Sequence, residues 1–88
     1  MNWVYRFDER ALKELKKLGR QAQVDILPYL AERVTGNADP NRFGKGLKAD
    51  LAGLWRYRVG DYRILCQIKD RELLVLVVAV GHRKYVYE

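Results

Sequence analysis

Hydrophobic and polar positions divide the chain into a short strand pattern, two helical patterns and a longer set of strand patterns. Aromatic residues alternate with other residues over positions 2–7, as is typical of a strand, because successive side chains point to opposite faces. Asp8 follows as a helix N-cap, and Gly19 is suited to end the same helix. We therefore expect a strand over residues 2–7 and a helix that runs to about Leu18.

The two helical patterns differ in how clearly they define a buried face. In the first helix, apolar side chains at spacings of three and four form one face: Ala11, Leu12, Leu15 and Leu18. The second pattern covers about residues 20–35, with an expected apolar face of Val24, Leu27, Ala31 and Val34 and with Leu30 at its border. Pro28 lies inside it and removes one backbone donor. The helix either kinks there, or one helix ends and another begins with Pro28 in its first turn.

Residues 54–66 predict a β-hairpin. Two alternating runs flank Gly60-Asp61, and glycine supplies the positive φ that a two-residue turn needs. The alternation places Arg56 and Arg58 on one face, and Arg63 follows on the return strand. The opposite face of the first strand receives Trp55, Tyr57 and Val59.

The other segments complete an α+β pattern. Residues 41–53 are a basic connection with three glycines, in which a regular helix is not expected, and residues 69–72 predict a second turn. Residues 73–80 are apolar on both faces, as in a central strand or a strand in an interface. We expect one domain over residues 1–88, with two N-terminal helices on a small, mostly antiparallel four-stranded sheet in the order β-α-α-β-β-β.

Composition indicates the class of partner and excludes several kinds of site. The 88 residues carry a formal net charge of +6, which favours an anionic partner such as nucleic acid, an acidic protein or an anionic membrane. The single Cys66 rules out an internal disulfide and is expected to be a buried thiol. The longest apolar run has eight residues, too few for a membrane helix, and the N-terminus does not resemble a signal peptide. We expect a cytoplasmic protein that does not bind a membrane.

The catalytic residues that most classes of enzyme require are missing from this sequence. There is one His, no Ser and no set of residues at metal-ligand spacing, so neither a metal site nor a cofactor is expected. Arginine, lysine and tyrosine remain. They suit a reaction in which an RNA 2′-hydroxyl attacks its own 3′-phosphate, since arginine can neutralise the charge that grows on phosphorus. Arginine is a poor base, which leaves the proton acceptor open.

The basic residues also have plainer interpretations. The hairpin arginines can be ordinary surface residues on a solvated sheet face. Arg42, Lys45 and Lys48 in the glycine-containing connection can follow a phosphate backbone or belong to an ordinary loop. Lys13, Lys17 and His82 are also candidates for RNA contacts. The two lysines lie on a helix face that is more often solvated than a binding site, and His82 is expected to support the chemistry and not to carry it out.

Three segments together resemble the RelE branch of the RelE/ParE toxins. They are Asp8-Glu-Arg-Ala-Leu-Lys-Glu-Leu-Lys-Lys-Leu18, Leu54-Trp-Arg-Tyr-Arg-Val-Gly-Asp-Tyr-Arg-Ile64 and Val80-Gly-His-Arg-Lys-Tyr-Val-Tyr87. They span nearly the whole chain in the expected order. The resemblance implies a small toxin that enters the ribosomal A site and cleaves mRNA there without a metal. It also implies a cognate RelB-like antitoxin with an acidic, amphipathic segment.

The resemblance also assigns roles to residues. Arg56 and Arg58 match the basic pair of the hairpin strand, Arg63 and Arg83 match two phosphate-facing arginines, and Tyr87 matches a terminal tyrosine. We expect these five residues to form the catalytic set. Tyr85 is a second terminal tyrosine, and this chain has arginine where well-studied relatives carry lysine on the hairpin strand. The alternatives are a ParE-like inhibitor of DNA gyrase and a basic nucleic-acid-binding module without activity.

Overall fold

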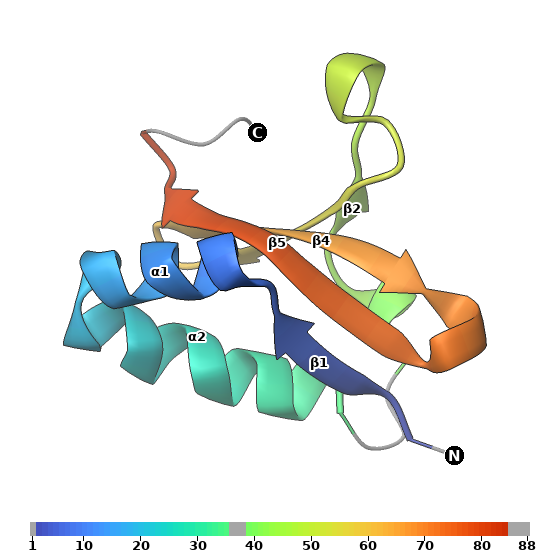
Figure 1. The fold of residues 1–88 in the computed structure, drawn as a ribbon, viewed down its shortest axis with the longest axis horizontal. Coiled ribbons are helices and arrows are strands. Elements are labelled where there is room, and N and C mark those ends of the chain that lie inside the picture. Colours follow the sequence, from blue (N-terminus) through green and yellow to red (C-terminus); the bar gives the residue numbers. More distant parts are fainter. Residues whose placement is uncertain (1, 36–38, 85–88) are drawn as a thin grey trace.

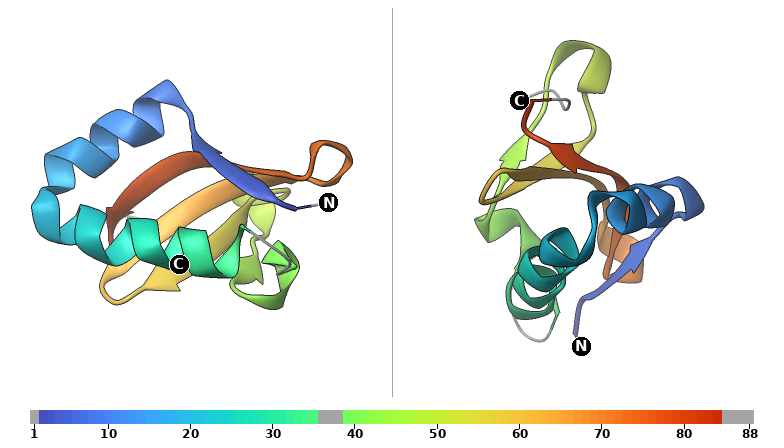
Figure 2. Two further views of the ribbon diagram at one scale, coloured as in Figure 1. Left: turned by 90° about the horizontal axis from the view of Figure 1, so that it is seen from below. Right: turned by 90° about the vertical axis from the view of Figure 1, so that its left-hand side faces the viewer.

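The computed structural model describes residues 2–35 and 39–84. In this part of the chain, two helices lie on the same side of one five-stranded sheet (Figures 1 and 2). The strand order is β1-β5-β4-β3-β2. The bounds are β1 Val4–Phe7, α1 Glu9–Leu18, α2 Arg20–Arg33, β2 Lys45–Gly46, β3 Trp55–Val59, β4 Tyr62–Lys69 and β5 Leu74–His82.

The α+β class is confirmed, but the expected number of strands was wrong. The glycine-containing connection supplies the fifth strand, β2, which pairs antiparallel with β3. Two short 3₁₀ turns, Pro40–Arg42 and Ala49–Leu51, lie before and after this strand. A two-residue strand has no detectable alternation of its own, so only its pairing with β3 defines it. The sheet is mostly antiparallel as expected, except that β1 runs parallel to β5.

The first helix begins and ends where the sequence predicts. The Asp8 carboxylate accepts a hydrogen bond from the Ala11 backbone N–H at 2.8 Å, and thereby satisfies one of the donors that a helix leaves unpaired at its start. Gly19 is the C-cap. The Asp8 backbone N–H donates to the Val77 carbonyl at 2.9 Å, so the cap also ties α1 to β5.

The second helix is continuous through Pro28, which settles the question that the sequence left open. Its expected buried face was wrong in part. Val24 is 55% exposed and Ala31 is also exposed, whereas Ala22, Ile26 and Leu30 are fully buried. Pro28 lies on the exposed side, where water can solvate the carbonyl that lacks its helical partner.

One hydrophobic core fills the space between the helices and the sheet. The helices contribute Ala11, Leu15, Ala22, Ile26 and Leu30, and the sheet contributes Tyr57, Ile64, Cys66, Val75, Val77 and Val80. Ala11 and Ala22 are both fully buried, so each helix contributes one small side chain to this core. No helix within the described residues is long and apolar enough to cross a membrane.

A β-bulge changes the alternation of β5 in its middle. Leu65 pairs with Ala79 while its neighbour Cys66 pairs with Val77, so Val78 is the extra residue. Before the bulge, odd-numbered residues such as Val75 and Val77 face the core, whereas after it even-numbered residues such as Val80 do so. Val77 and Val80 both face the core, and Gly81 shares the opposite face with its partner Arg63. This opposite face, which the helices do not cover, is called the open face below.

Candidate functional site

Three hairpin arginines lie on the open face, as the alternation predicts. Arg58 is directly opposite Arg63 across β3 and β4, and Arg56 is opposite Leu65, two residues further along β4. The other face of β3 contributes Tyr57 and Val59 to the core. The strand register therefore collects three guanidinium groups on one side of two neighbouring strands.

The hairpin turn holds Arg63 in a defined position. The Arg63 side chain is 1% exposed, and its Nη1 donates to the carbonyls of Gly60 at 3.1 Å and Tyr62 at 3.0 Å. Gly60 has a φ of +57°, a conformation that glycine adopts without the steric cost of a side chain. The turn thus orients its carbonyls toward the guanidinium that follows it.

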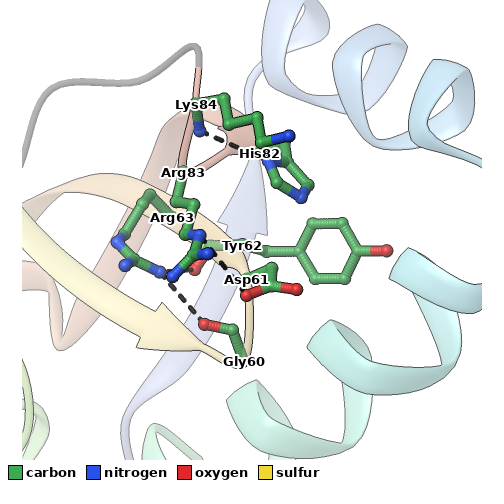
Figure 3. A network of polar contacts seen from close by, with 7 residues as sticks. All are labelled: Gly60, Asp61, Tyr62, Arg63, His82, Arg83 and Lys84. Carbon is green, nitrogen blue, oxygen red and sulfur yellow. Dashed lines mark hydrogen bonds and ion pairs between the residues drawn. The ribbon is translucent and has the colours of Figure 1, made fainter.

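Arg83 joins this cluster from the end of β5. Its backbone N–H donates to the Asp61 carbonyl at 2.6 Å, and its Nε lies 3.6 Å from the Asp61 carboxylate. Figure 3 shows the Arg83 and Arg63 side chains on the same side of the sheet. The bulge at Val78 makes this possible, because it gives Gly81 and Arg83 the same facing as Arg63. Sequence reasoning treated Asp61 only as a turn residue and missed its contact with Arg83.

His82 lies on the opposite side of β5 from this cluster. It pairs with Tyr62 across the sheet, and the two rings make an edge contact with centroids 6.1 Å apart (Figure 3). The His82 Nδ1 accepts a hydrogen bond from the Lys84 backbone N–H at 3.3 Å. The structure therefore does not bring His82 together with the arginines of the open face.

The basic connection contributes one lysine directly beside the arginines. Lys45 in β2 is opposite Arg56 in β3, so the two side chains leave the sheet on the same face. Lys48 is exposed beyond β2 and lines a shallow depression together with Lys45. Arg42 is also exposed, and its guanidinium lies over the Phe43 ring with 5.9 Å to the centroid.

The remaining candidates lie apart from the hairpin or outside the described residues. Lys13 and Lys17 are exposed on α1, where they share a depression with Glu9 and Glu14. These carboxylates reduce the local excess of positive charge. Tyr87, like Tyr85, lies outside the described residues.

The open face has an apolar half as well as a basic half. A groove of about 550 Å³ lies between the start of α1, the sheet and the connection before β3. Its apolar lining comprises Leu51, Leu54, Leu65, Val78 and Ala79. Glu14 lies at its edge and accepts a hydrogen bond from the Val80 backbone N–H at 3.0 Å.

Burial shifts three acidic side chains toward their neutral forms. Desolvation raises the pKa of the Cys66 thiol and, together with nearby negative groups, the pKa of the Tyr57 hydroxyl. Burial also raises the pKa of Tyr29, although Arg33 beside it acts in the opposite direction. Cys66 is therefore a core residue and not a nucleophile. Within residues 2–35 and 39–84, no three His, Cys, Asp or Glu side chains gather as a metal site would require.

Comparisons with known proteins agree with this geometry. The family model described as the ParE toxin of type II toxin–antitoxin systems matches residues 5–87. The chain is 35% identical to toxin RelG of Mycobacterium tuberculosis, over 99% of this chain and 98% of RelG. It is 32% identical to the mRNA interferase toxin RelE of Escherichia coli K12, over 96% of this chain and 86% of RelE.

Solved structures show the same fold. The RelBE2 toxin–antitoxin complex of M. tuberculosis contains a chain with a TM-score of 0.84 and 30% identity, with 94% of this chain and 93% of that chain covered. For the E. coli RelBE complex, the TM-score is 0.68 and the identity 26%, with coverage of 91% and 95%. The fold and the basic face of the sheet thus define the class of this protein, which is a small α+β toxin. The chain belongs to the ParE toxin family of type II toxin–antitoxin systems and is homologous to RelE and RelG.

Proposed function

We propose that this toxin is a ribosome-dependent endoribonuclease that cleaves mRNA in the A site and so inhibits translation. The observation that carries the proposal is the register that collects Arg56, Arg58 and Arg63 on the open face, with Arg83 beside the hairpin turn. Relatives that bear the name mRNA interferase support the substrate class. A ribosomal target also implies a cytoplasmic protein.

The proposed reaction breaks one phosphodiester bond within the RNA. The 2′-oxygen attacks the adjacent phosphorus, its proton passes to a base, and the 5′-oxygen leaves after it gains a proton. The products are a 2′,3′-cyclic phosphate and a 5′-hydroxyl end, and the reaction requires no metal ion. The guanidinium groups would stabilise the negative charge that grows on the phosphate oxygens in the transition state. Tyr87 would stack on a base or move a proton.

The test is single-turnover cleavage of mRNA on programmed ribosomes. We expect Arg83→Ala and Arg63→Ala each to slow cleavage by about a hundredfold, which corresponds to roughly 3 kcal/mol of transition-state stabilisation. Free RNA should be cut poorly even by the unmodified toxin, because the ribosome supplies part of the alignment. Tyr87→Phe distinguishes two roles of this residue. The cleavage rate should fall only slightly if the ring stacks on a base, and as much as in the arginine variants if the hydroxyl transfers a proton.

Two controls make the result specific. Arg71→Ala removes an exposed charge at the opposite end of β4 and should leave the rate unchanged. Because Arg63 is buried, Arg63→Lys and a thermal unfolding curve separate a chemical loss from a folding defect. Near-normal rates for both alanine variants would contradict the proposal. Inhibition of gyrase supercoiling by the same protein would then favour the ParE-like alternative, and RNA binding without cleavage would favour a binding module.

We also propose that a cognate antitoxin with an acidic, amphipathic segment neutralises this toxin. Similar solved structures include RelB–RelE complexes from M. tuberculosis, E. coli and Methanococcus jannaschii. The open face offers an apolar groove beside a basic region, which suits a segment with one apolar and one acidic side. Such a segment would gain its order on binding.

A further inference from the structure

Arg83 lies just beyond the last strand of the sheet. β5 ends at His82, and the pair of His82 with Tyr62 is the last pair between β4 and β5. The ladder of strand pairs therefore stops before Arg83. An arginine side chain has several rotatable bonds and loses conformational entropy when it is held in one geometry. Other contacts must orient its guanidinium group.

Asp61 in the hairpin turn supplies two such contacts. Its backbone carbonyl accepts a hydrogen bond from the Arg83 backbone N–H at 2.6 Å, and its Oδ1 lies 3.6 Å from the Arg83 Nε (Figure 3). The first contact involves only the backbone, so any residue at position 61 could make it. The second contact requires a side-chain acceptor at this position, and a carboxylate adds the opposite charge.

The same turn also holds Arg63. The carbonyls of Gly60 and Tyr62 accept hydrogen bonds from the Arg63 Nη1 at 3.1 Å and 3.0 Å. Gly60, Asp61 and Tyr62 are consecutive, so one short turn contacts two arginines that come from distant parts of the chain. Figure 3 shows both arginine side chains beside this turn. The position of one guanidinium relative to the other therefore depends on the turn.

The ion pair engages the Arg83 guanidinium at one edge only. Nε carries a single N–H, whereas Nη1 and Nη2 carry the other four and form the fork that can bind two oxygens of a phosphate. Among the described residues, no acceptor other than Asp61 contacts this guanidinium. A carboxylate at Nε thus orients the planar group and leaves its terminal nitrogens available to a ligand.

The geometry of the turn allows the carboxylate to be tested by itself. Gly60 has the positive φ of the turn, +57°, whereas Asp61 is not among the described non-glycine residues with positive φ. A type II′ hairpin turn has this pattern. Asparagine can therefore replace Asp61 without backbone strain. It keeps the size of the side chain and the backbone carbonyl, and it removes only the negative charge.

We propose that Asp61 is a positioning residue, whose carboxylate directs the terminal nitrogens of Arg83 toward the phosphate that is cleaved, next to Arg63. The inference rests on the proposed function. The negative charge has a second effect, because it also repels the phosphate. Both side chains of the ion pair are more than half exposed, so solvent screens this repulsion. Asp61 should therefore raise kcat while it weakens the binding of RNA only slightly.

The test is cleavage of mRNA on programmed ribosomes by the variant Asp61→Asn. We expect kcat to fall about five- to tenfold, because the Arg83 guanidinium is no longer held in one orientation. KM should stay the same or fall by up to about twofold, since a repelling charge is removed. The melting temperature should change by less than about 4 °C, because an exposed ion pair adds little to stability. A merely structural role would instead lower the melting temperature and leave kcat unchanged.

Two further variants make the result specific. Asp70→Asn removes an exposed carboxylate from the turn at the other end of β4, so it changes the net charge equally and should leave kcat and KM unchanged. In combination with Arg83→Ala, Asp61→Asn should have almost no further effect on kcat, because the guanidinium that it positions is already absent. Equal losses in the two asparagine variants, or effects of Asp61→Asn and Arg83→Ala that multiply, would overturn the proposed role.

A second measurement does not depend on cleavage. In the NMR spectrum of the free toxin, the Arg83 Nε–H signal should differ from that of the exposed Arg71 in its chemical shift and in its exchange with water. Asp61→Asn should remove most of this difference, because the partner of the Nε–H loses its charge. An Arg83 signal that is the same in both proteins would show that the contact does not form in solution, and the proposal would be wrong.

The two proposals can fail separately. If Arg83→Ala abolishes cleavage while Asp61→Asn keeps the kcat of the unmodified toxin, the positioning role is wrong and the nuclease proposal stands. If the unmodified toxin does not cleave RNA but the Arg83 Nε–H signal depends on Asp61, the nuclease proposal is wrong and Asp61 still positions Arg83.

Discussion

Two arginine side chains of the sheet are buried more deeply than is usual for this residue type. The burial of Arg63 is compensated in part by two carbonyls of the hairpin turn, which accept from its Nη1. The burial of Arg56 leaves its Nε without an acceptor among the described residues. A buried donor without an acceptor costs free energy, which the packing of the surrounding sheet must offset.

The buried thiol of Cys66 and hydroxyl of Tyr57 should make the stability of the toxin depend on alkaline pH. The ordinary pKa values of Cys66 and Tyr57 are 9.0 and 10.0, and burial raises both in the folded state. Above about pH 9 the unfolded chain therefore loses protons that the folded chain keeps. Stability should be complete below pH 9 and should fall as pH rises, by up to about 1.4 kcal/mol per pH unit for each group.

The measurement is the melting temperature between pH 7 and pH 11. Cys66→Ala should move the start of the decline from about pH 9 toward pH 10, because the thiol is the first of these groups to ionise in the unfolded chain. The variant will be less stable at every pH, since it removes a buried side chain, so the comparison uses the shape of each curve. A flat profile up to pH 11 would show that these groups are not buried as described.

At the level of elements, the cap of α1 connects helix formation to the sheet. The Asp8 carboxylate accepts a hydrogen bond from the Ala11 N–H, while the Asp8 backbone N–H donates one to the Val77 carbonyl in β5. We expect Asp8→Ala to lower the free energy of unfolding by about 1 kcal/mol, because one helix donor loses its acceptor. Denaturant unfolding measures the change. Asp8→Asn should retain most of the stability, and equal losses in both variants would show that the side-chain cap is not the cause.

The bulge in β5 is a second element-scale feature with a functional consequence. Val78 adds one residue between the pairs Cys66–Val77 and Leu65–Ala79. Without it, the residues after Val77 would exchange faces, and Arg83 would leave the face of Arg63. His82 occupies the helix-facing side for the same reason. The position of a single extra residue therefore decides which of two neighbouring basic side chains can join the arginine cluster.

At the scale of the whole molecule, the net charge of +6 acts together with the apolar groove. We expect the affinity for the acidic segment of the cognate antitoxin to fall with salt but to remain measurable at 0.5 M. Ionic strength screens the exposed charges, whereas it has little effect on buried apolar contacts. Titration calorimetry at several salt concentrations is the measurement. A salt-independent affinity for a segment without acidic residues would contradict the expectation.

The sequence by itself determined those features that depend on neighbouring residues. The hairpin around Gly60-Asp61, the capping of α1 by Asp8 and the separation of Arg56 and Arg58 from Tyr57 all follow from local turn chemistry and alternation. The resemblance of three segments also indicated the family correctly. The first segment lies in α1, the second in the β3–β4 hairpin, and the third begins in β5. Roles assigned to individual residues remain predictions.

Only the tertiary structure decided the features that depend on residues far apart in the chain. The pairing of Lys45 with Arg56, the parallel pairing of β1 with β5 and the bulge at Val78 are matters of register between strands, which no local pattern encodes. The buried face of α2 likewise includes Ala22 with Ile26 and Leu30 and excludes Val24, because the rotation of the helix against the sheet decides which stripe of side chains is covered. Local chemistry determined the helices and the hairpin, and packing between distant elements determined which side chains meet.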